Sequence, residues 1–223
     1  MLEKTYDLRI PLGTISMLCG PAGCGKTVKV AHILKNKNML FKDGEKVDNV
    51  VFCYATWQPL YSELKELNIV TKWVNYLPTN EEFIDLVKDY KEEGSICIFD
   101  DFLNEINKDM VQICCVSSRH YNTASFFLFQ NLFPKNPLAR EISLNAKFIY
   151  VFRSPREKSQ FSYLAYQILP KEYKWLIQVY NEVTAVPYGC LIIDLRQEAE
   201  DEIRFRSNIL PHEYPTIVWK KSR

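Results

Sequence analysis

Eight consecutive residues near the start of the chain match the pattern GxxxxGK[ST], in which x is any residue. Glycines let such a loop wrap so that successive backbone N–H groups point inward at a β-phosphate, and the helix that begins there adds its N-terminal dipole. Lys26 would place a positive charge on the β- and γ-phosphate oxygens, and the Thr27 hydroxyl would bind Mg²⁺. Average composition produces this pattern by chance in roughly one per cent of chains of this length. The residues expected to bind ATP with Mg²⁺ are Gly20, Pro21, Ala22, Gly23, Cys24, Gly25, Lys26 and Thr27.

Two carboxylates follow an apolar segment, residues 96–99, in the middle of the chain. In an enzyme with a phosphate-binding loop, the first carboxylate at such a strand end holds the Mg²⁺ shell, so Asp100 is assigned to the metal. A second carboxylate beside it can orient and deprotonate an attacking water, and Asp101 is assigned this catalytic role. Aspartate is shorter than the glutamate often found at that position, so Glu105 remains the alternative base.

Another polar position follows a very apolar segment, residues 124–129. Gln130 comes directly after it. An extra strand between the loop strand and the acidic strand would place this side chain where it can hydrogen-bond the γ-phosphate or the lytic water. A motor that fires between subunits also needs an arginine in trans to stabilise charge in the transition state. The sequence does not choose between the arginines of this half, which are Arg119, Arg140, Arg153 and Arg156.

These side chains need an α/β fold to bring them together, and the apolar pattern predicts one. Short apolar runs alternate with segments of helical periodicity, so we expect a mostly parallel central sheet flanked by helices. Expected strands cover residues 15–19, 49–54, 95–99, 124–129 and 148–152. Expected helices cover residues 26–37, 60–67, 81–91, 107–118, 159–168 and 171–183. Two further short strands, 190–195 and 203–205, are expected as a terminal hairpin.

The composition is that of one globular domain. The chain has 223 residues, of which 47% are hydrophobic and 25% charged, so we expect a single domain over residues 1–223 with a short C-terminal extension from about residue 186. Glycine is scarce, with only 7 residues in the chain, yet three of them lie within positions 20–25. A chain that avoids glycine and then concentrates it in one place is expected to build a special backbone there.

Charge and cysteine content exclude several classes of protein. The 28 Lys and Arg residues nearly balance the 27 Asp and Glu residues, so bulk charge does not attract nucleic acid or membrane, and a nucleic-acid partner would need a local surface. The seven cysteines include no CxxC pair, which favours reduced thiols in a cytosolic or nuclear compartment and no zinc site. No apolar run approaches the ~18 residues of a membrane span. We therefore expect an intracellular protein with neither a membrane partner nor a cleavable signal.

Several of these motifs, taken in order, resemble a known family. The order begins with the loop at 20–27, the acidic strand at 96–101 and the polar tip at 130–133, and continues with the segments 140–145 and 152–156. This run resembles the genome-packaging ATPases of the FtsK–HerA superfamily found in poxvirus-like large DNA viruses, adintoviruses and Polinton elements. The resemblance covers about residues 10–210. Its two nucleotide motifs are shared with many families, and the stretch from Gln130 to Arg156 is the more specific part.

The resemblance implies an ATP-driven double-stranded DNA translocase that fills a capsid. It implies a P-loop NTPase of the additional-strand, RecA-like class, and a homo-oligomeric ring, commonly a hexamer, that holds the nucleotide between subunits. Gln130 falls on the sensor position, and Arg140 or Arg156 becomes the favoured trans arginine. Capsid or portal proteins would be partners at an assembly site in host cytoplasm or nucleus, or in the virion. The short chain leaves little room for an added DNA-binding domain, so loops of the core would contact DNA.

Two other enzyme classes share the loop. A nucleotide or nucleoside kinase, or another P-loop phosphotransferase, has a similar length, but such kinases need a mobile lid with several arginines, and the arginines here are spread. A regulatory GTPase needs the pattern N/T-K-x-D, and residues 36–39 and 107–110 both lack the final Asp. The paired Asp100 and Asp101 and the Gln130 tip fit activation of water better than phosphoryl transfer to an acceptor base.

Overall fold

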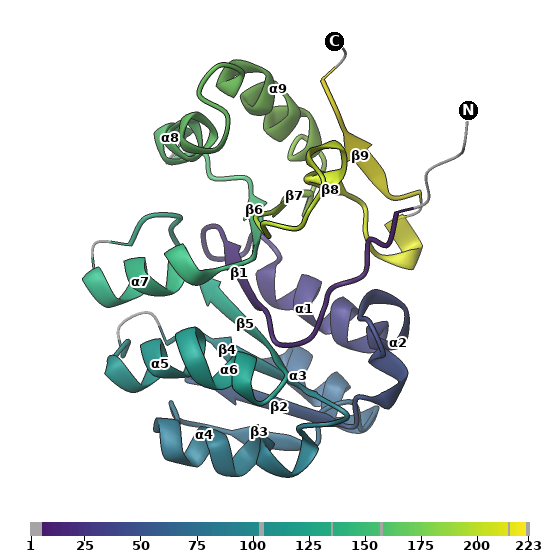
Figure 1. Cartoon of the computed structure of the whole chain (residues 1–223), viewed down its shortest axis with the longest axis vertical. Coiled ribbons are helices and arrows are strands. Elements are labelled where there is room, and N and C mark those ends of the chain that lie inside the picture. Colours follow the sequence, from purple (N-terminus) through teal and green to yellow (C-terminus); the bar gives the residue numbers. More distant parts are fainter. Residues whose placement is uncertain (1–5, 103–104, 135, 157, 214, 222–223) are drawn as a thin grey trace.

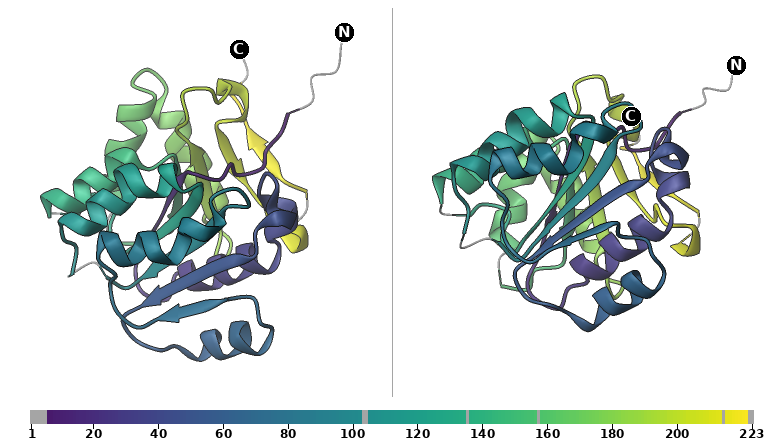
Figure 2. Two further views of the ribbon diagram at one scale, coloured as in Figure 1. Left: turned by 60° about the horizontal axis from the view of Figure 1, so that its bottom comes forward. Right: turned by 90° about the horizontal axis from the view of Figure 1, so that it is seen from below.

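The computed structural model describes residues 6–102, 105–134, 136–156, 158–213 and 215–221. Within these residues, nine strands form one twisted sheet in the order β3-β2-β4-β5-β1-β6-β7-β8-β9, with helices on both faces (Figures 1 and 2). The strands from β3 to β6 in this order are parallel, and the last three are antiparallel. The predicted α/β fold with a mostly parallel central sheet is confirmed.

The central strands form because they are apolar runs that are buried on both sides of the sheet, whereas the two edge strands are partly exposed. Alternate residues of the central strands point to opposite layers, so Phe126 packs into one apolar layer and Phe127 into the other. Helices α4, α5, α7, α8 and α9 cover one layer, and α1 and α3 cover the other. The strands are β1 (Ile15–Cys19), β2 (Asn49–Tyr54), β3 (Lys72–Val74), β4 (Ser95–Asp100), β5 (Thr123–Phe129), β6 (Phe148–Phe152), β7 (Cys190–Asp194), β8 (Phe205–Ser207) and β9 (Ile217–Trp219).

Most helices follow the predicted segments, and the differences from prediction concern both helices and strands. The longer ones are α1 (Lys26–Lys35), α3 (Pro59–Glu66), α4 (Asn80–Val87), α7 (Pro137–Asn145), α8 (Lys158–Ile168) and α9 (Tyr173–Val183), and the shorter ones are α2 (Lys37–Leu40), α5 (Lys108–Gln112) and α6 (Ser118–His120). The predicted helix at 107–118 is broken, because a π-helical turn at Ile113–Ser117 separates α5 from α6. Helices α2 and α7 and strands β3 and β9 were not predicted. The strand expected at 203–205 is wrong in its bounds, because Ile203 is buried in a 3₁₀ turn and the strand begins at Phe205.

The strand order places the candidate site. Strand β5 lies between β1, which leads into the glycine loop, and β4, which ends at Asp100. This is the extra strand of the additional-strand class, so that part of the fold prediction is confirmed. Because these strands are parallel, their carboxyl ends meet at one edge of the sheet. The loop, the carboxylates and Gln130 all follow those ends.

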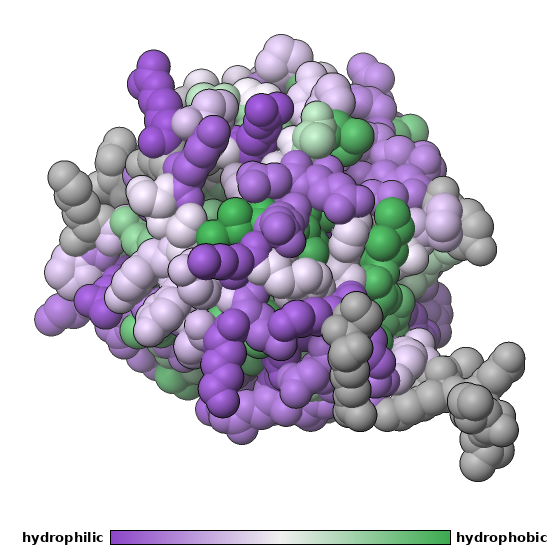
Figure 3. Space-filling model, turned by 90° about the horizontal axis from the view of Figure 1, so that it is seen from above, coloured by the Kyte–Doolittle hydropathy of each residue, from purple (hydrophilic) through white to green (hydrophobic). Residues whose placement is uncertain are grey.

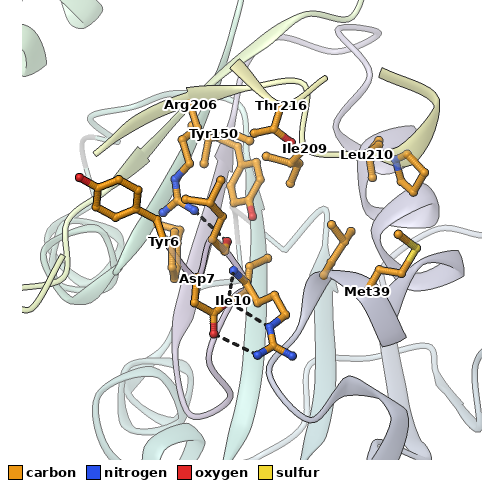
Figure 4. A pocket seen from close by; sticks show the side chains of 15 residues that line it. Tyr6, Asp7, Ile10, Met39, Tyr150, Arg206, Ile209, Leu210 and Thr216 are labelled. Carbon is orange, nitrogen blue, oxygen red and sulfur yellow. Dashed lines mark hydrogen bonds and ion pairs between the residues drawn. The ribbon is translucent and has the colours of Figure 1, made fainter. Parts of the chain in front are cut away.

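The two ends of the described chain pack together on the same sheet. Strand β7 pairs antiparallel with β6, and β8 and β9 continue the sheet beyond it. Buried Arg206 of β8 pairs with Asp194 of β7 and donates to the carbonyl of Leu8 at 2.8 Å. Arg206 and Tyr150 line a cavity of about 390 Å³ under this N-terminal segment (Figure 4). Strands β7, β8 and β9, which follow residue 186, thus continue the same sheet.

The outer surface carries scattered apolar side chains. Leu144, Met39 and Tyr188 are more than half exposed, and they belong to α7, α2 and the loop before β7. On the face shown in Figure 3, green apolar areas are separated by purple charged ones.

Candidate functional site

The glycine loop joins the end of β1 to the start of α1, and its backbone depends on glycine at three positions. Gly23 and Gly25 have φ of 76° and 102°, a conformation that side chains disfavour. Gly20 is needed for space, because a Cβ there would lie 2.7 Å from Cys24 Sγ and 2.8 Å from Phe152 Cβ. The Gly20 amide also donates to the carbonyl of Phe129, at the end of β5. The loop is thereby tied to the strand that carries Gln130.

Lys26 lies over the loop that it would serve. Its Nζ donates to the carbonyls of Gly20 at 2.6 Å and Pro21 at 3.0 Å. Gly25 at the N-cap has no side chain to cap α1, so backbone N–H groups at the helix start remain available to an anion. An ammonium group and helix amides thus converge on the loop, as phosphate binding requires.

Thr27 and Asp100 meet although they are 73 residues apart. Thr27 Oγ1 donates to Asp100 Oδ2 at 3.0 Å, which leaves the lone pairs of the threonine oxygen available to a cation. Asp100 is only 4% exposed, and burial raises the pKa of its carboxyl, while hydrogen bonds from Tyr61 and Thr27 act in the opposite direction. A hydroxyl and a carboxylate are the hard oxygen donors that Mg²⁺ takes in nucleotide sites. The two residues fit the predicted metal site.

Asp101 lies just outside this buried pair. The chain leaves β4 with φ of +68° at Asp101, and its side chain is exposed. Aspartate is among the few residues other than glycine that tolerate this conformation. Glu105 is also exposed. Both carboxylates are therefore open to water, and both remain candidates for the base.

Gln130 follows β5 directly, on the loop side of the sheet. It lines a small cavity together with Cys19 and Gly20 of the loop region and Gln160 of α8. Gln160 Oε1 accepts hydrogen bonds from the backbone amides of Leu132 at 3.0 Å and Phe133 at 3.4 Å. The structure brings Gln130 to the glycine loop, and Gln160, a residue to which the sequence analysis gave no role, holds the segment after it.

The four arginines occupy different places. Arg119 lies in α6, next to Gly13, which precedes β1, so it lies at the opposite end of the strands from the loop. Arg140 of α7 is exposed and lines a groove of about 770 Å³ between α7 and α8. Arg156, after β6, is also exposed. Arg153 instead shares a cavity of about 330 Å³ with loop residues 21–24. The structure does not bring Arg140 or Arg156 into the phosphate cradle of their own subunit.

Two further residues contact the site without having been predicted. Tyr61 in α3 donates from its hydroxyl to Asp100 Oδ2 at 2.7 Å, and burial raises the pKa of this phenol well above its ordinary value. The ring of Tyr188 covers Gly25, where a Cβ would lie 2.8 Å from Tyr188 Cδ1. The sequence does not predict a role for either residue, because Tyr61 lies in a segment with only a helical pattern and Tyr188 lies in a connection before β7.

Metal-binding clusters and membrane-spanning helices are absent from the part of the chain that the structure describes. It contains no cluster of three or more His, Cys, Asp or Glu side chains that could hold a metal. None of its helices is long and apolar enough to cross a membrane. Its cysteines whose side chains are described are unpaired thiols, and four of them are buried: Cys19, Cys53, Cys97 and Cys190.

Comparison with known proteins gives structural matches only. No protein family model matches the sequence, and no curated protein does either. The cytoplasmic domain of the type VII secretion ATPase EccC from Thermomonospora curvata matches with a TM-score of 0.52 and 12% identity over 89% of this chain. EssC (ATPases 2 and 3) from Geobacillus thermodenitrificans matches with a TM-score of 0.53 and 14% identity over 86% of this chain. The chain spans only 29% and 41% of those two proteins. Similarity at this level of identity shows a shared fold alone, and the chain has the α/β fold of P-loop ATPases.

Proposed function

We propose that this chain binds ATP with Mg²⁺ and hydrolyses it. The observation that carries the proposal is the hydrogen bond between Thr27 and Asp100, which joins the helix start below the loop to the end of the acidic strand. Loop amides and Lys26 bind the phosphates, while Thr27 and Asp100 hold the metal. Mg²⁺ supplies charge that neutralises the phosphate oxygens.

The remaining polar groups at this sheet edge orient and deprotonate the attacking water. Asp101, or Glu105 in its place, accepts the proton of the attacking water, and Gln130 orients that water or contacts the γ-phosphate. Support comes from their position: Asp101 follows Asp100 directly, and Gln130 shares a cavity with Gly20. These groups lie at the edge where the phosphate loop lies, which is the arrangement that hydrolysis requires.

Phosphate release from ATP, measured for the wild type and for Lys26→Ala, tests the hydrolysis. We expect Mg²⁺-dependent release in the wild type and a loss of at least about 100-fold in the variant, because the charge on the β- and γ-oxygens is removed. Phosphorylation of a nucleoside monophosphate without net hydrolysis would contradict the proposal and identify a P-loop phosphotransferase instead.

The finer proposal is that hydrolysis drives double-stranded DNA into a capsid. Support comes from the resemblance of the segments between Gln130 and Arg156 to packaging ATPases of the FtsK–HerA superfamily, together with the fold. The chain would act as a ring, commonly a hexamer, with DNA in its pore and capsid or portal proteins as partners at an assembly site in host cytoplasm or nucleus. Arg140 and Arg156 are both exposed, as a group that serves a neighbouring subunit must be.

Stimulation of ATP hydrolysis by DNA tests this second step separately. We expect double-stranded DNA to raise the rate of phosphate release several-fold, and the effect to weaken with salt because the contacts are with phosphates. A polyanion without a duplex, such as heparin, is the control. Hydrolysis that is unaffected by DNA, or equally stimulated by heparin, would contradict the proposed DNA translocation. The proposed ATP hydrolysis would still stand.

A further inference from the structure

The buried carboxylate of the candidate metal site has a second hydroxyl partner. Tyr61 in the first turn of α3 is completely buried, and its hydroxyl donates to Asp100 Oδ2 at 2.7 Å. Thr27 donates to the same oxygen at 3.0 Å. Both hydroxyl bonds fall on Oδ2, so neither of these two hydroxyls occupies Oδ1, which can face the metal or its bound water.

This arrangement fixes the direction of the carboxylate. A carboxylate held by one hydrogen bond can still turn about its χ2 bond, which has a broad energy well. Two donors that approach Oδ2 from different elements, α1 and α3, restrict that rotation. Because Thr27 must also serve the metal, Tyr61 is the donor whose only described role at the site is to hold Asp100.

Tyr61 is itself held by a group of aromatic rings at the end of β2. Its ring centroid lies 4.7 Å from Phe52, 5.5 Å from Trp57 and 5.7 Å from Trp73. Trp57 is 41% exposed, and Lys65 lies over its ring. The rings form a continuous path from the candidate metal site to the surface.

We propose that Tyr61 is a positioning residue for Mg²⁺ in the nucleotide site: its hydroxyl holds the Asp100 carboxylate in the orientation that receives the metal, and its ring links metal binding to Trp57 and Trp73. The inference rests on the proposed function of this site. It assigns no direct contact between Tyr61 and the substrate.

The test compares Tyr61→Phe with Tyr54→Phe, its matched control. Tyr54 belongs to the same ring group, 5.6 Å from Tyr61, and among the described residues it makes no hydrogen bond to Asp100. We expect Tyr61→Phe to raise the half-saturating Mg²⁺ concentration for hydrolysis about three- to tenfold, since one hydrogen bond to a charged group is lost. Binding of a fluorescent ATP analogue in EDTA should stay unchanged, and Tyr54→Phe should match the wild type in both measurements.

The possible outcomes distinguish a failure of the Tyr61 positioning role from a failure of the proposed ATP hydrolysis. If the wild type hydrolyses ATP and Tyr61→Phe has an unchanged Mg²⁺ dependence, only the positioning role is wrong. If the wild type neither binds the analogue nor hydrolyses ATP, the proposed function fails and the inference fails with it. A purely structural role would lower stability and weaken binding in EDTA as well, and that result also contradicts the proposal.

Tryptophan emission gives a second reading that does not depend on the folding of Tyr61→Phe. We expect Mg²⁺ added to the nucleotide-bound protein to change the emission. The change should persist in the double variant Trp175→Phe/Trp219→Phe and disappear in Trp57→Phe/Trp73→Phe. A full metal-dependent change in the second double variant, or no change in the first, overturns the link between the metal site and the ring group.

Discussion

At the scale of single residues, the three glycines of the loop answer different requirements. Gly23 has a positive φ but open space around it, whereas Gly25 has a positive φ and the ring of Tyr188 against it. Gly20 is limited by space alone, because Cys24 and Phe152 lie where its Cβ would be. The pattern of glycines in the sequence predicts the loop, but only the structure separates strain from crowding.

Alanine substitution should therefore rank these positions. Gly23→Ala should cost about 1–2 kcal/mol through backbone strain alone. Gly25→Ala should cost more and weaken nucleotide binding at least tenfold, because its Cβ also meets Tyr188 at 2.8 Å. Thermal unfolding and binding of a fluorescent ATP analogue measure the two effects. Equal losses of stability and of nucleotide binding at Gly23 and Gly25 would show that Tyr188 can move away from the added Cβ at no cost.

Asp100 combines a functional role with a cost in stability. Burial raises the pKa of its carboxyl in the folded protein, so the folded state holds a proton more tightly than the unfolded state. Stability attributable to this group is then greatest at low pH and falls as the pH rises through the raised pKa. The proposed metal site would require the charged form at neutral pH, and burial makes that form the less stable one in this position.

Asp100→Asn should separate these two properties. The amide keeps an acceptor for Thr27 and Tyr61 but carries no charge, so we expect Mg²⁺-dependent hydrolysis to fall at least about 100-fold. The unfolding midpoint at neutral pH should equal or exceed that of the wild type, with the difference shrinking as the pH falls. Asp101→Asn, at the exposed neighbouring position, is the control for a carboxylate without this burial. A clear loss of stability in Asp100→Asn alone would mean that its charge stabilises the fold.

At the scale of elements, the sequence predicts what depends on apolar pattern. The buried strands β1, β2, β4, β5 and β6 are continuous apolar runs, so pattern alone locates them and, with the loop, the site edge. Helix α7 escaped prediction because it begins in a proline-rich connection, although Asn136 caps it and Pro137 occupies its first turn. The roles of Tyr61 and Gln160 at the site were not predicted for another reason. These side chains reach the site from α3 and α8 through tertiary contacts that no local sequence pattern encodes.

Helix α8 positions the segment after β5, which gives a prediction at this scale. Gln160 accepts hydrogen bonds from the amides of Leu132 and Phe133, so Gln160→Leu leaves those buried donors without that partner. We expect the maximal rate of hydrolysis to fall about tenfold through misplacement of Gln130, with nucleotide affinity changed less than threefold. Gln167→Leu, an exposed position on the same helix, is the control. A loss confined to affinity would place the effect on the loop rather than on Gln130.

At the scale of the whole molecule, the arginines differ in whether they lie near the glycine loop of their own chain. Arg153 shares a cavity with loop residues 21–24 of its own chain. Arg140 on α7 and Arg156 after β6 do not line that cavity, and all three side chains are exposed. A ring in which each site borrows an arginine from its neighbour would use Arg140 or Arg156, whereas Arg153 would act within its own subunit.

Mixed oligomers test this division. Arg140→Ala or Arg156→Ala subunits keep Asp101, and Asp101→Asn subunits keep the arginines, so a site formed between the two kinds is complete only if the arginine acts in trans. Random mixing in equal amounts should then restore roughly a quarter of the wild-type rate, from two inactive parents. Arg153→Ala mixed with Asp101→Asn is the matched control and should recover nothing, because a site that takes both residues from one subunit is then incomplete in every subunit. Recovery with Arg153→Ala, and none with Arg140→Ala or Arg156→Ala, would make Arg153 the residue that crosses the interface.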